Sequence, residues 1–377
     1  MNTPCPIHLD FELRPVLAVG AELKNTFCLT RGNLAFLSQP IGDLKNLETL
    51  EFFKQEVERY KNLLLIEPEI VAHDLHPDYL GTKFAEEYCS VLHAPCSVLP
   101  IQHHHAHIAS CMAENGITEK VIGVAADGMG FGEDGKIWGF EFLLADFHGY
   151  KRCAHLKYIP MPGGDKATQE PWRMAVSYLY SACADNLPGK FIKRWGQDRV
   201  SFIIRMIERS INSPLTSSAG RLFDAVSSLL GVRDVVEYEA QAAIELEMIA
   251  DDSEEGEYGF EVFEEGEVFI IDPSPTILEI VQDINQGTAP AIVSAKFHNT
   301  VASFILNVAA RIRDKTGIEK VALSGGVFQN RYLLERVKPR LAEQGFIPIL
   351  HSQVPTNDSG ISLGQAVIAG RKVKRCA

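Results

Sequence analysis

The sequence predicts an α/β fold of two lobes, each built on a three-stranded β-meander. Its 377 residues exceed the size that one hydrophobic core usually serves, which favours two lobes or domains. Residues 16–39 and 121–156 share one pattern, in which an apolar strand ends at small or polar residues and a hairpin follows. Segments with helical periodicity separate the two copies. We therefore expect a duplicated β-meander/α core.

The first copy is VLAVGAELKNTFCLTRGNLAFLSQ, which predicts a strand, a polar turn, a strand, a tight RGN turn and a third strand. Helices are expected over residues 47–60, 79–90 and 102–114, and the last ends at ENG, a common C-terminal stop. We expect residues 1–14 to be an N-terminal tail and residues 15–118 to form lobe I.

The second copy, VIGVAADGMGFGEDGKIWGFEFLLADFHGYKRCAHL, predicts a strand, a glycine-rich turn, a strand, an HGY turn and a strand. A helical insertion over residues 168–250 and the acidic stretch DDSEEGEYGFEVFEEGEVFIID, expected as a solvated hairpin, follow it. A long helix is expected near 294–315, then strand, Ser-Gly-Gly turn and helix. Residues 119–355 are predicted to form lobe II, and residues 356–377 a C-terminal helix that returns to the cleft. This order is typical of the actin-like ATPase architecture, in which a nucleotide lies between the lobes.

Composition excludes several classes of function. The formal net charge of −13, without a local basic patch, disfavours nucleic-acid binding. No apolar run approaches the ~18 residues of a membrane span, and no secretory signal is visible. The eight cysteines are scattered without a CxxC pair, which argues against a zinc ribbon and a disulfide scaffold. We expect a cytoplasmic protein.

The stretch IQHHHAHIAS offers candidate metal ligands. His103 and His107 are four residues apart and share one helical face, with Cβ atoms ~6 Å apart. The pair alone equally fits a polar turn at a helix start. Asp127, expected to end the strand after this helix, and Asp358, before the last helix, could be a turn residue and an N-cap. In an actin-like fold, however, both face the cleft, where the four side chains would suit a divalent metal: Zn, Fe or Mg/Mn.

Three stretches are candidates for binding ATP or AMP. LSGGVFQN, with Ser324, Gly325, Gly326 and Asn330, places backbone N–H groups at a helix start, which is a phosphate-binding device. DGMGFGEDG supplies Gly128 and Gly130 in a second glycine-rich turn. SSAGRLFDAV places Gly220 and Asp224 where a ribose could bind, although a capped helix with a surface aspartate explains it equally. The sequence shows no nucleophile motif, so no catalytic residue is assigned, and we expect the nucleophile to come from a partner.

These motifs together resemble one family. GAELKNTFCL, QPIGDL, HDLHPDYL, QHHHAHIASC, DGMGFGEDGKIWGFEFL, MPGGDKATQEPWRMA, TSSAGRLFDAV, YEAQAAIELE, SGGVFQN and NDSGISLGQA occur in the order found in the C-terminal half of HypF-type carbamoyltransferases of [NiFe]-hydrogenase maturation. The resemblance implies the actin-like module shared with tRNA threonylcarbamoyl transferases. It implies metal binding by His103, His107 and Asp358, with Asp127 as a further ligand, and nucleotide contacts at Gly220, Asp224, Gly325, Gly326 and Asn330.

The resemblance implies carbamoyl transfer from carbamoyl adenylate to the C-terminal cysteine of a HypE-type partner. Proteins of this type normally begin with acylphosphatase-like, zinc-finger and adenylating domains, and this chain begins where those end. We therefore expect a carbamate-adenylating domain in trans or in a missing N-terminal part. The alternatives are a tRNA threonylcarbamoyl transferase, which the acidic charge disfavours, an O-carbamoyltransferase, and a non-catalytic nucleotide-binding scaffold.

Overall fold

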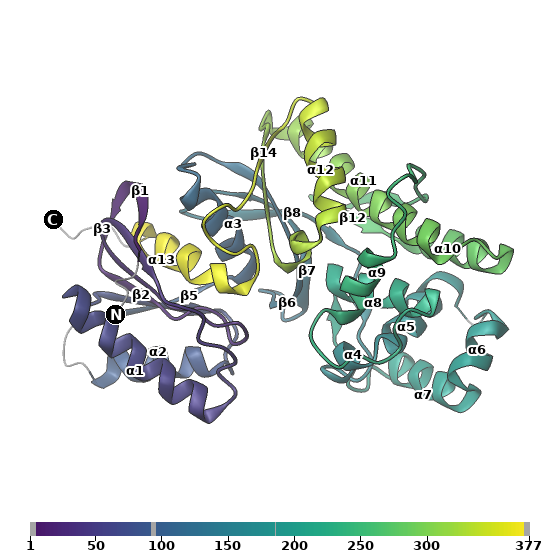
Figure 1. Ribbon diagram of the computed structural model, residues 1–377, viewed down its shortest axis with the longest axis horizontal. Helices are drawn as coiled ribbons and strands as arrows, with labels where there is room; N and C mark the ends of the chain where they lie inside the picture. The colour runs from purple at the N-terminus through teal and green to yellow at the C-terminus, as the bar shows by residue number, and fades with distance from the viewer. Residues whose placement is uncertain (1–4, 92–95, 185, 373–377) are drawn as a thin grey trace.

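The computed structural model describes residues 5–91, 96–184 and 186–372, and arranges them as two sheets with helices between and around them (Figure 1). Residues 1–4 of the predicted tail and 373–377 of the predicted C-terminal segment lie outside the described residues. None of the helices in the described ranges is long and apolar enough to cross a membrane.

Lobe I contains a five-stranded sheet in the order β1-β3-β2-β4-β5. Its strands are β1 (Ile7–Leu13), β2 (Val16–Ala18), β3 (Cys28–Leu37), β4 (Ile70–Asp74) and β5 (Ser97–Ile101). Its helices are α1 (Leu47–Leu64) and α2 (Leu80–Val91), close to the expected ranges. Helix α1 begins where the Asn46 side chain accepts hydrogen bonds from two backbone N–H groups, and its residue Phe53 packs edge-on against Phe27 beside the sheet.

The predicted meander of lobe I is wrong in one respect, and so is the predicted N-terminal tail. The RGN sequence forms no turn, because β3 runs through it without a break. Gly32 has φ +59° there, and the pairing of β1 with β3 shifts register at this point, as at a β-bulge. The three antiparallel strands of this lobe are therefore β1, β3 and β2, and β1 comes from the segment predicted as a tail.

Lobe II contains a nine-stranded sheet with the main order β11-β12-β8-β7-β6-β13-β14, and two short strands beside β7. Its strands are β6 (Val121–Phe131), β7 (Ile137–Ala145), β8 (Tyr150–Leu156), β9 (Ile159–Pro160), β10 (Leu215–Thr216), β11 (Glu261–Glu265), β12 (Val268–Asp272), β13 (Lys320–Ser324) and β14 (Ile347–Ile349). The predicted meander over residues 121–156 is confirmed as β6, β7 and β8, which pair antiparallel.

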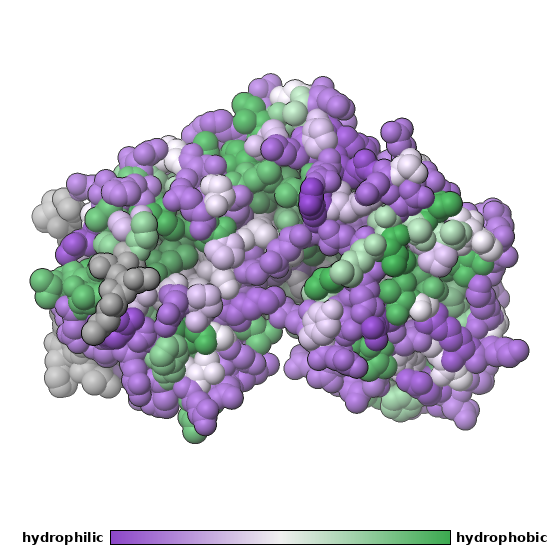
Figure 2. Space-filling view, in the orientation of Figure 1, coloured by the Kyte–Doolittle hydropathy of each residue, from purple (hydrophilic) through white to green (hydrophobic). Residues whose placement is uncertain are grey.

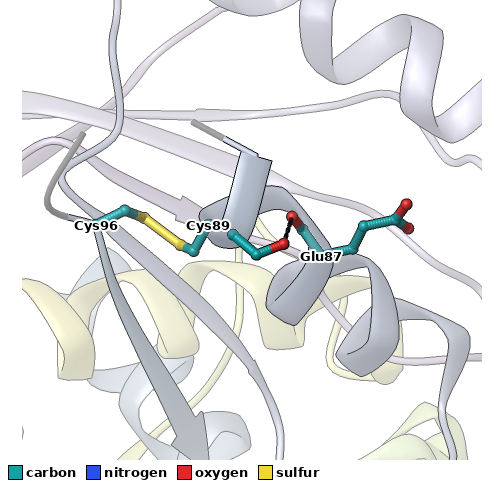
Figure 3. The surroundings of a disulfide bond; sticks show 4 residues. Glu87, Cys89 and Cys96 are labelled. Carbon is teal, nitrogen blue, oxygen red and sulfur yellow. Dashed lines mark hydrogen bonds between the residues drawn. A yellow bond between two sulfur atoms is a disulfide. The ribbon is translucent and has the colours of Figure 1, made fainter. Parts of the chain in front are cut away.

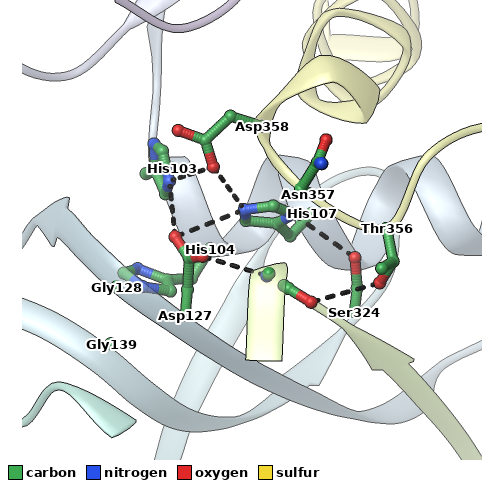
Figure 4. A network of polar contacts seen from close by, with 12 residues as sticks. His103, His104, His107, Asp127, Gly128, Gly139, Ser324, Thr356, Asn357 and Asp358 are labelled. Atoms are coloured by element: carbon green, nitrogen blue, oxygen red, sulfur yellow. Dashed lines mark hydrogen bonds and ion pairs between the residues drawn. The ribbon is translucent and has the colours of Figure 1, made fainter. Parts of the chain in front are cut away.

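The predicted glycine-rich turn between the first two strands of this meander begins later than the sequence indicates. The letters DGMGF belong to β6, whose pairing with β7 shifts register between Ala126 and Gly130. Asp127 therefore lies at an irregularity inside the strand and does not end it. Such bulges re-aim side chains, and this one directs Asp127 toward α3 (Figure 4).

The predicted insertions are also present. The helical insertion comprises α4 (Lys166–Gln169), α5 (Pro171–Cys183), α6 (Gly189–Trp195), α7 (Gln197–Glu208), α8 (Ala219–Leu230) and α9 (Gln241–Met248). The acidic stretch ends in the expected hairpin of β11 and β12, but β12 is largely buried and pairs parallel with β8, so the hairpin extends the sheet. The remaining helices of lobe II are α10 (Ser274–Gln286), α11 (Pro290–Thr316) and α12 (Arg331–Glu343).

Two helices lie between the sheets: α3 (His103–Glu114) and α13 (Ile361–Lys372). Helix α13 packs on β2, β3 and β4 of lobe I, α3 packs on β6 and β13 of lobe II, and the two helices pack against each other. They approach so closely that a Cβ atom on Gly364 would lie 1.8 Å from the carbonyl oxygen of Ala106. This contact brings Asp358, just before α13, beside His103 and His107 of α3 (Figure 4).

One pair of cysteines is bonded, which their scattered spacing did not predict. Cys89 in α2 is joined to Cys96, directly before β5 (Figure 3). The bond ties the end of α2 to the edge strand of lobe I. One such bond among the described residues does not form a disulfide scaffold, and Cys5, Cys28, Cys111, Cys153 and Cys183 are free.

Candidate active site

Two histidines and two aspartates meet at the base of the cleft (Figure 4). His103 and His107 come from the first turns of α3, Asp127 from the bulge in β6, and Asp358 from the 3-10 turn η2 (Asp358–Gly360) before α13. The four ligand atoms lie within 4.8 Å of one another. The structure thus brings together the four residues that the sequence proposed as ligands.

The arrangement fits a metal ion. His103 Nε2 lies 3.3 Å from Asp127 Oδ2 and 3.8 Å from Asp358 Oδ1. His107 Nε2 lies 3.6 Å and 3.5 Å from the same two oxygens. Ligand atoms at about 2.1 Å from a tetrahedral ion would lie about 3.4 Å from one another. His107 Nε2 is buried without a hydrogen-bond partner, and a metal ion would satisfy it. Two imidazoles and two carboxylates suit Zn, Fe or Mn.

Each of three ligands is held from behind by a partner that the sequence did not indicate. Asp74, at the end of β4, accepts a hydrogen bond from His103 Nδ1 at 2.7 Å. His107 Nδ1 lies 3.3 Å from the hydroxyl oxygen of Ser324. Asp127 Oδ1 accepts a hydrogen bond from the backbone N–H of Gly326 at 3.0 Å. Because such partners fix the ring and carboxylate orientations, the ligand atoms face one point.

The charged groups of the site shift one another's pKa values. Burial acts to lower the pKa of His103, but the nearby carboxylates of Asp74, Asp127 and Asp358 hold it well above its ordinary value. The pKa of His107 is raised in the same way, against burial, by Asp127 and Asp358. Burial acts to raise the pKa of Asp127, but His103 and His107 hold it well below its ordinary value. The cluster therefore favours bound positive charge.

The other two histidines of the run face elsewhere. His104 Nδ1 lies 3.2 Å from the side-chain nitrogen of Gln102, the residue that caps α3. His105 Nε2–H donates to the carbonyl oxygen of Asp146 at 2.7 Å. Burial lowers the pKa of His104 well below its ordinary value and that of His105 to about 4. Both rings are therefore neutral structural groups at neutral pH.

A cavity of about 750 Å³ opens beside the cluster, where the surface is hollowed between lobe I and the α4–α9 part of lobe II (Figure 2). Lobe I contributes Leu23, Lys24 and Tyr79 to its lining, and Asp127 and Asp358 form the end nearest the cluster. Helices α8 and α9 and the 3-10 turn η1 (Gly326–Gln329) form much of the opposite wall. This volume is within the range of small-molecule and cofactor pockets, about 300–1,000 Å³.

The structure divides the predicted nucleotide residues into two groups. The first group lines the cavity: Gly128, Gly220, Asp224, Gly326 and Asn330. The second group lies outside its lining: Gly130, Ser324 and Gly325. Gly130 instead packs on the histidines, because a Cβ atom there would lie 2.5 Å from His104 Cε1. The second group therefore supports the histidine cluster and not the cavity wall.

The Ser-Gly-Gly turn also uses its N–H groups differently from the sequence prediction. The N–H of Gly325 donates to the carbonyl oxygen of Thr356 at 2.9 Å, and that of Gly326 donates to Asp127. Both predicted phosphate donors are thus occupied within the protein. The turn supports the cluster: Gly325 has φ +106°, and a Cβ on Gly326 would lie 3.0 Å from Asp127 Oδ1.

Helix α8 presents a close pair of polar side chains, Arg221 and Asp224, to the cavity. Arg221 Nη2 lies 2.7 Å from Asp224 Oδ2, and both residues line the cavity. Burial raises the pKa of Asp224, and Arg221 opposes that shift. Gly220 lies against Gly128, where an added Cβ would be 3.1 Å from the Gly128 Cα, so these two glycines keep the wall open. Asn330 caps α12 and also donates to His298, so its amide is largely committed to structure.

Sequence reasoning missed the lobe I side of the cavity. Lys24 forms an ion pair of 2.8 Å with Glu239, which also lines the cavity, and Tyr79 is a further lining residue from lobe I. The Lys24 side chain is 38% exposed, so this pair contributes little stability by itself. Lys24 and Tyr79 belong to the stretches GAELKNTFCL and HDLHPDYL, which are part of the family resemblance, but nothing in their spacing indicates a position in the cleft.

Comparison with known proteins gives a consistent result. Residues 12–114 match the family described as the HypF Kae1-like domain, and residues 123–365 match the carbamoyltransferase Kae1-like domain, second subdomain. The chain is 38% identical to Carbamoyltransferase HypF2 of Cupriavidus necator over 97% of this chain and 48% of that protein. It is also 38% identical to the Carbamoyltransferase HypF homolog of the same organism, over 95% of this chain and 92% of that protein.

Solved structures show the same relationship. The chain matches a crystal structure of full-length HypF in the phosphate- and nucleotide-bound form with a TM-score of 0.93 and 44% identity, covering 99% of this chain and 58% of that one. The T. kodakarensis HypF structure matches with a TM-score of 0.87 and 33% identity, covering 98% and 48%. The chain thus spans about half the length of most of these relatives, and the predicted actin-like fold is confirmed. The chain belongs to the HypF carbamoyltransferase family and corresponds to its Kae1-like part.

Proposed function

We propose that the cleft transfers a carbamoyl group from carbamoyl adenylate to the C-terminal cysteine of a HypE-type partner protein. The observation that carries this proposal is a single cavity lined by both Asp127 and Asp358 of the candidate metal cluster and by Gly220 and Asp224 of α8. One ligand could therefore place its phosphate beside the cluster while its ribose contacts α8.

The residues of the chain bind and orient the adenylate. Asp224, held by Arg221, accepts hydrogen bonds from ribose hydroxyls, and Gly128 and Gly220 leave room for the nucleotide. A divalent metal bound by His103, His107, Asp127 and Asp358 would supply Lewis-acid stabilisation of the phosphate leaving group. Lys24 also lines the cavity and would supply a second positive charge for the phosphate.

The reaction is an acyl transfer. The thiolate sulfur of the partner attacks the carbamoyl carbon, a C–S bond forms, and the bond from carbon to the phosphate oxygen breaks. The products are AMP and an S-carbamoyl cysteine, and the thiol proton passes to solvent. None of the free cysteines within the described ranges lines the cavity, and burial raises the pKa of both Cys28 and Cys111. The thiol is therefore expected from the partner.

Nucleotide placement is tested by Asp224→Ala. Loss of hydrogen bonds between ribose and a charged group should weaken AMP binding by ~1–3 kcal/mol in titration calorimetry. Asp234→Ala, which removes a carboxylate paired with Arg194 outside the cavity lining, is the control. Equal AMP affinity in native protein and Asp224→Ala would place the ribose elsewhere.

Activity is tested with a HypE-type partner and a separate adenylating domain that makes carbamoyl adenylate in situ from carbamoyl phosphate and ATP. Mass spectrometry of the partner should show one added carbamoyl group with the native chain and none with His103→Ala/His107→Ala. AMP binding without any transfer to the partner would favour a nucleotide-binding scaffold over an enzyme.

A further inference from the structure

A row of buried polar side chains leads away from His107 along the inner side of α3. Ser324, at the end of β13, lies 3.3 Å from His107 Nδ1 through its hydroxyl oxygen. The same oxygen lies 2.8 Å from His351 Nε2, and His351 Nδ1 contacts Glu114 Oε1. Ser324 and the side chain of Glu114 are fully buried, and the His351 side chain is 5% exposed.

The chemistry of these groups permits one direction for the hydrogen bonds. His107 Nε2 faces Asp127 and Asp358, so a metal would bind this nitrogen and the ring proton must be on Nδ1. That proton is donated to Ser324. The Ser324 hydroxyl then donates to His351 Nε2, and the Nδ1 proton of His351 is donated to Glu114. A carboxylate at the far end is the required final acceptor.

Glu114 is well held in this role. Its Oε2 accepts hydrogen bonds from the backbone N–H groups of Ser352, Gln353 and Val354, at 3.0, 2.6 and 3.3 Å. Burial acts to raise the pKa of Glu114, but His351 and these N–H groups lower it below the ordinary value. Residues 352–354, which Glu114 fixes in this way, are soon followed by Thr356, whose carbonyl oxygen accepts a hydrogen bond from Gly325, and by Asp358. Glu114 therefore supports two of the four candidate ligands: His107 through His351 and Ser324, and Asp358 through the segment that precedes it.

We propose that Glu114, His351 and Ser324 are positioning residues that orient His107 for metal binding through a one-way hydrogen-bond relay. The inference rests on the proposed metal site. Helix α3 carries both ends of the relay, with His107 in its first turns and Glu114 at its end, while β13 and the segment after β14 supply the middle. His103 has a direct carboxylate partner in Asp74, whereas the carboxylate partner of His107 acts through two intervening side chains.

The test compares two deletions of a buried serine hydroxyl. Ser324→Ala interrupts the relay, whereas Ser177→Ala removes a hydroxyl that donates to the Pro160 carbonyl oxygen away from the cleft. Each full-length chain is freed of metal by chelation and titrated with zinc in a calorimeter. Ser324→Ala should raise the zinc Kd by about 10–100-fold, the usual effect of losing a partner behind a metal ligand. Ser177→Ala should change it less than about twofold.

A second pair of variants protects the test against a folding defect. His351→Gln keeps one acceptor and one donor on the side chain and should retain most of the zinc affinity, whereas His351→Leu should lose it as Ser324→Ala does. In zinc-loaded native protein, a proton–nitrogen correlation spectrum should show a protected His107 Nδ1–H resonance, which shifts in Ser324→Ala and stays in place in Ser177→Ala.

The outcomes separate the two proposals. If the native chain and Ser324→Ala bind zinc equally tightly, the relay is wrong and the metal site stands. If both serine variants lose affinity equally, the effect is one of general stability and the relay is again wrong. If the native chain binds no zinc, the proposed metal site fails, and the relay fails with it.

Discussion

The pKa values of the four histidines of α3 are shifted in opposite directions on the two sides of the helix. His103 and His107 are on the cleft side, and His104 and His105 are on the side that faces the sheet of lobe II, which we call the sheet side. His103 and His107 face the cleft, and carboxylates raise their pKa values, whereas the pKa values of His104 and His105 are lowered. All four side chains are at most 2% exposed, so burial alone does not explain the difference. The acidic neighbours Asp74, Asp127 and Asp358 decide it, because their carboxylates lie within ion-pair distance of His103 or His107, whereas Asp127 acts on His104 too weakly to offset burial. A run of histidines is therefore divided by what the rest of the fold places beside each ring.

The largest difference between the two sides should be in metal content. Purified native protein should carry about one equivalent of divalent metal per chain by elemental analysis, and His103→Ala/His107→Ala should carry none, because half of the ligand set is removed. His105→Gln is the matched control and should retain the metal. Equal metal content in native protein and the double variant would show that the cleft histidines are not ligands.

The next largest effect should be a loss of folding stability at acid pH, caused by His105 on the sheet side. The folded-state pKa of His105 is about 4, below the ordinary value of 6.5, so the unfolded chain binds the proton first as pH falls. Its contribution to stability is complete above pH 6.5 and is lost as pH falls to 4. The difference between the unfolded-state pKa of 6.5 and the folded-state pKa of about 4 corresponds to about 3 kcal/mol.

Urea unfolding at pH 7 and pH 4 measures this contribution. The glutamine amide of His105→Gln can still donate to the Asp146 carbonyl oxygen but does not titrate, so the variant should lose about 3 kcal/mol less stability than the native protein between the two pH values. The same loss in both proteins would mean that His105 already carries a proton in the folded state or titrates normally.

A smaller effect should follow from the partner of His103. Asp74→Asn keeps the shape of the side chain but removes the negative charge behind the ring, and should weaken zinc binding by about 10–100-fold in calorimetry. Asp272→Asn, at a largely buried aspartate paired with Lys157 outside the cleft, is the control and should leave zinc affinity unchanged. An Asp74→Asn chain with native affinity would remove Asp74 from the description of the site.

Much of the fold could be predicted because it depends on local pattern. The β6–β8 meander, the helix that carries the histidines and the hairpin of the acidic stretch follow from strand alternation, capping residues and turn sequences. The spacing of His103 and His107 was equally informative, since residues four apart on a helix share a face. Lobe I was harder, because the strand β1 and the unbroken β3 follow from pairing between segments and not from either segment alone.

The rest of the site depends on contacts that are distant in sequence. His351 reaches His107 from 244 positions away through Ser324, and Asp74 reaches His103 from another strand. The glycines of the Ser-Gly-Gly turn resemble phosphate donors locally, yet in the fold their N–H groups bond Thr356 and Asp127. No local pattern distinguishes a free N–H group from one that a distant segment will occupy.

The most direct measurement is an anomalous-scattering map from a crystal of the chain grown with zinc and AMP. We expect one zinc peak at about 2.0–2.2 Å from His103 Nε2, His107 Nε2, Asp127 Oδ2 and Asp358 Oδ1. AMP should lie in the adjoining cavity with its phosphate toward the peak and its ribose toward Asp224. A zinc peak elsewhere, or AMP bound outside this cavity with no zinc between the four side chains, would contradict the account.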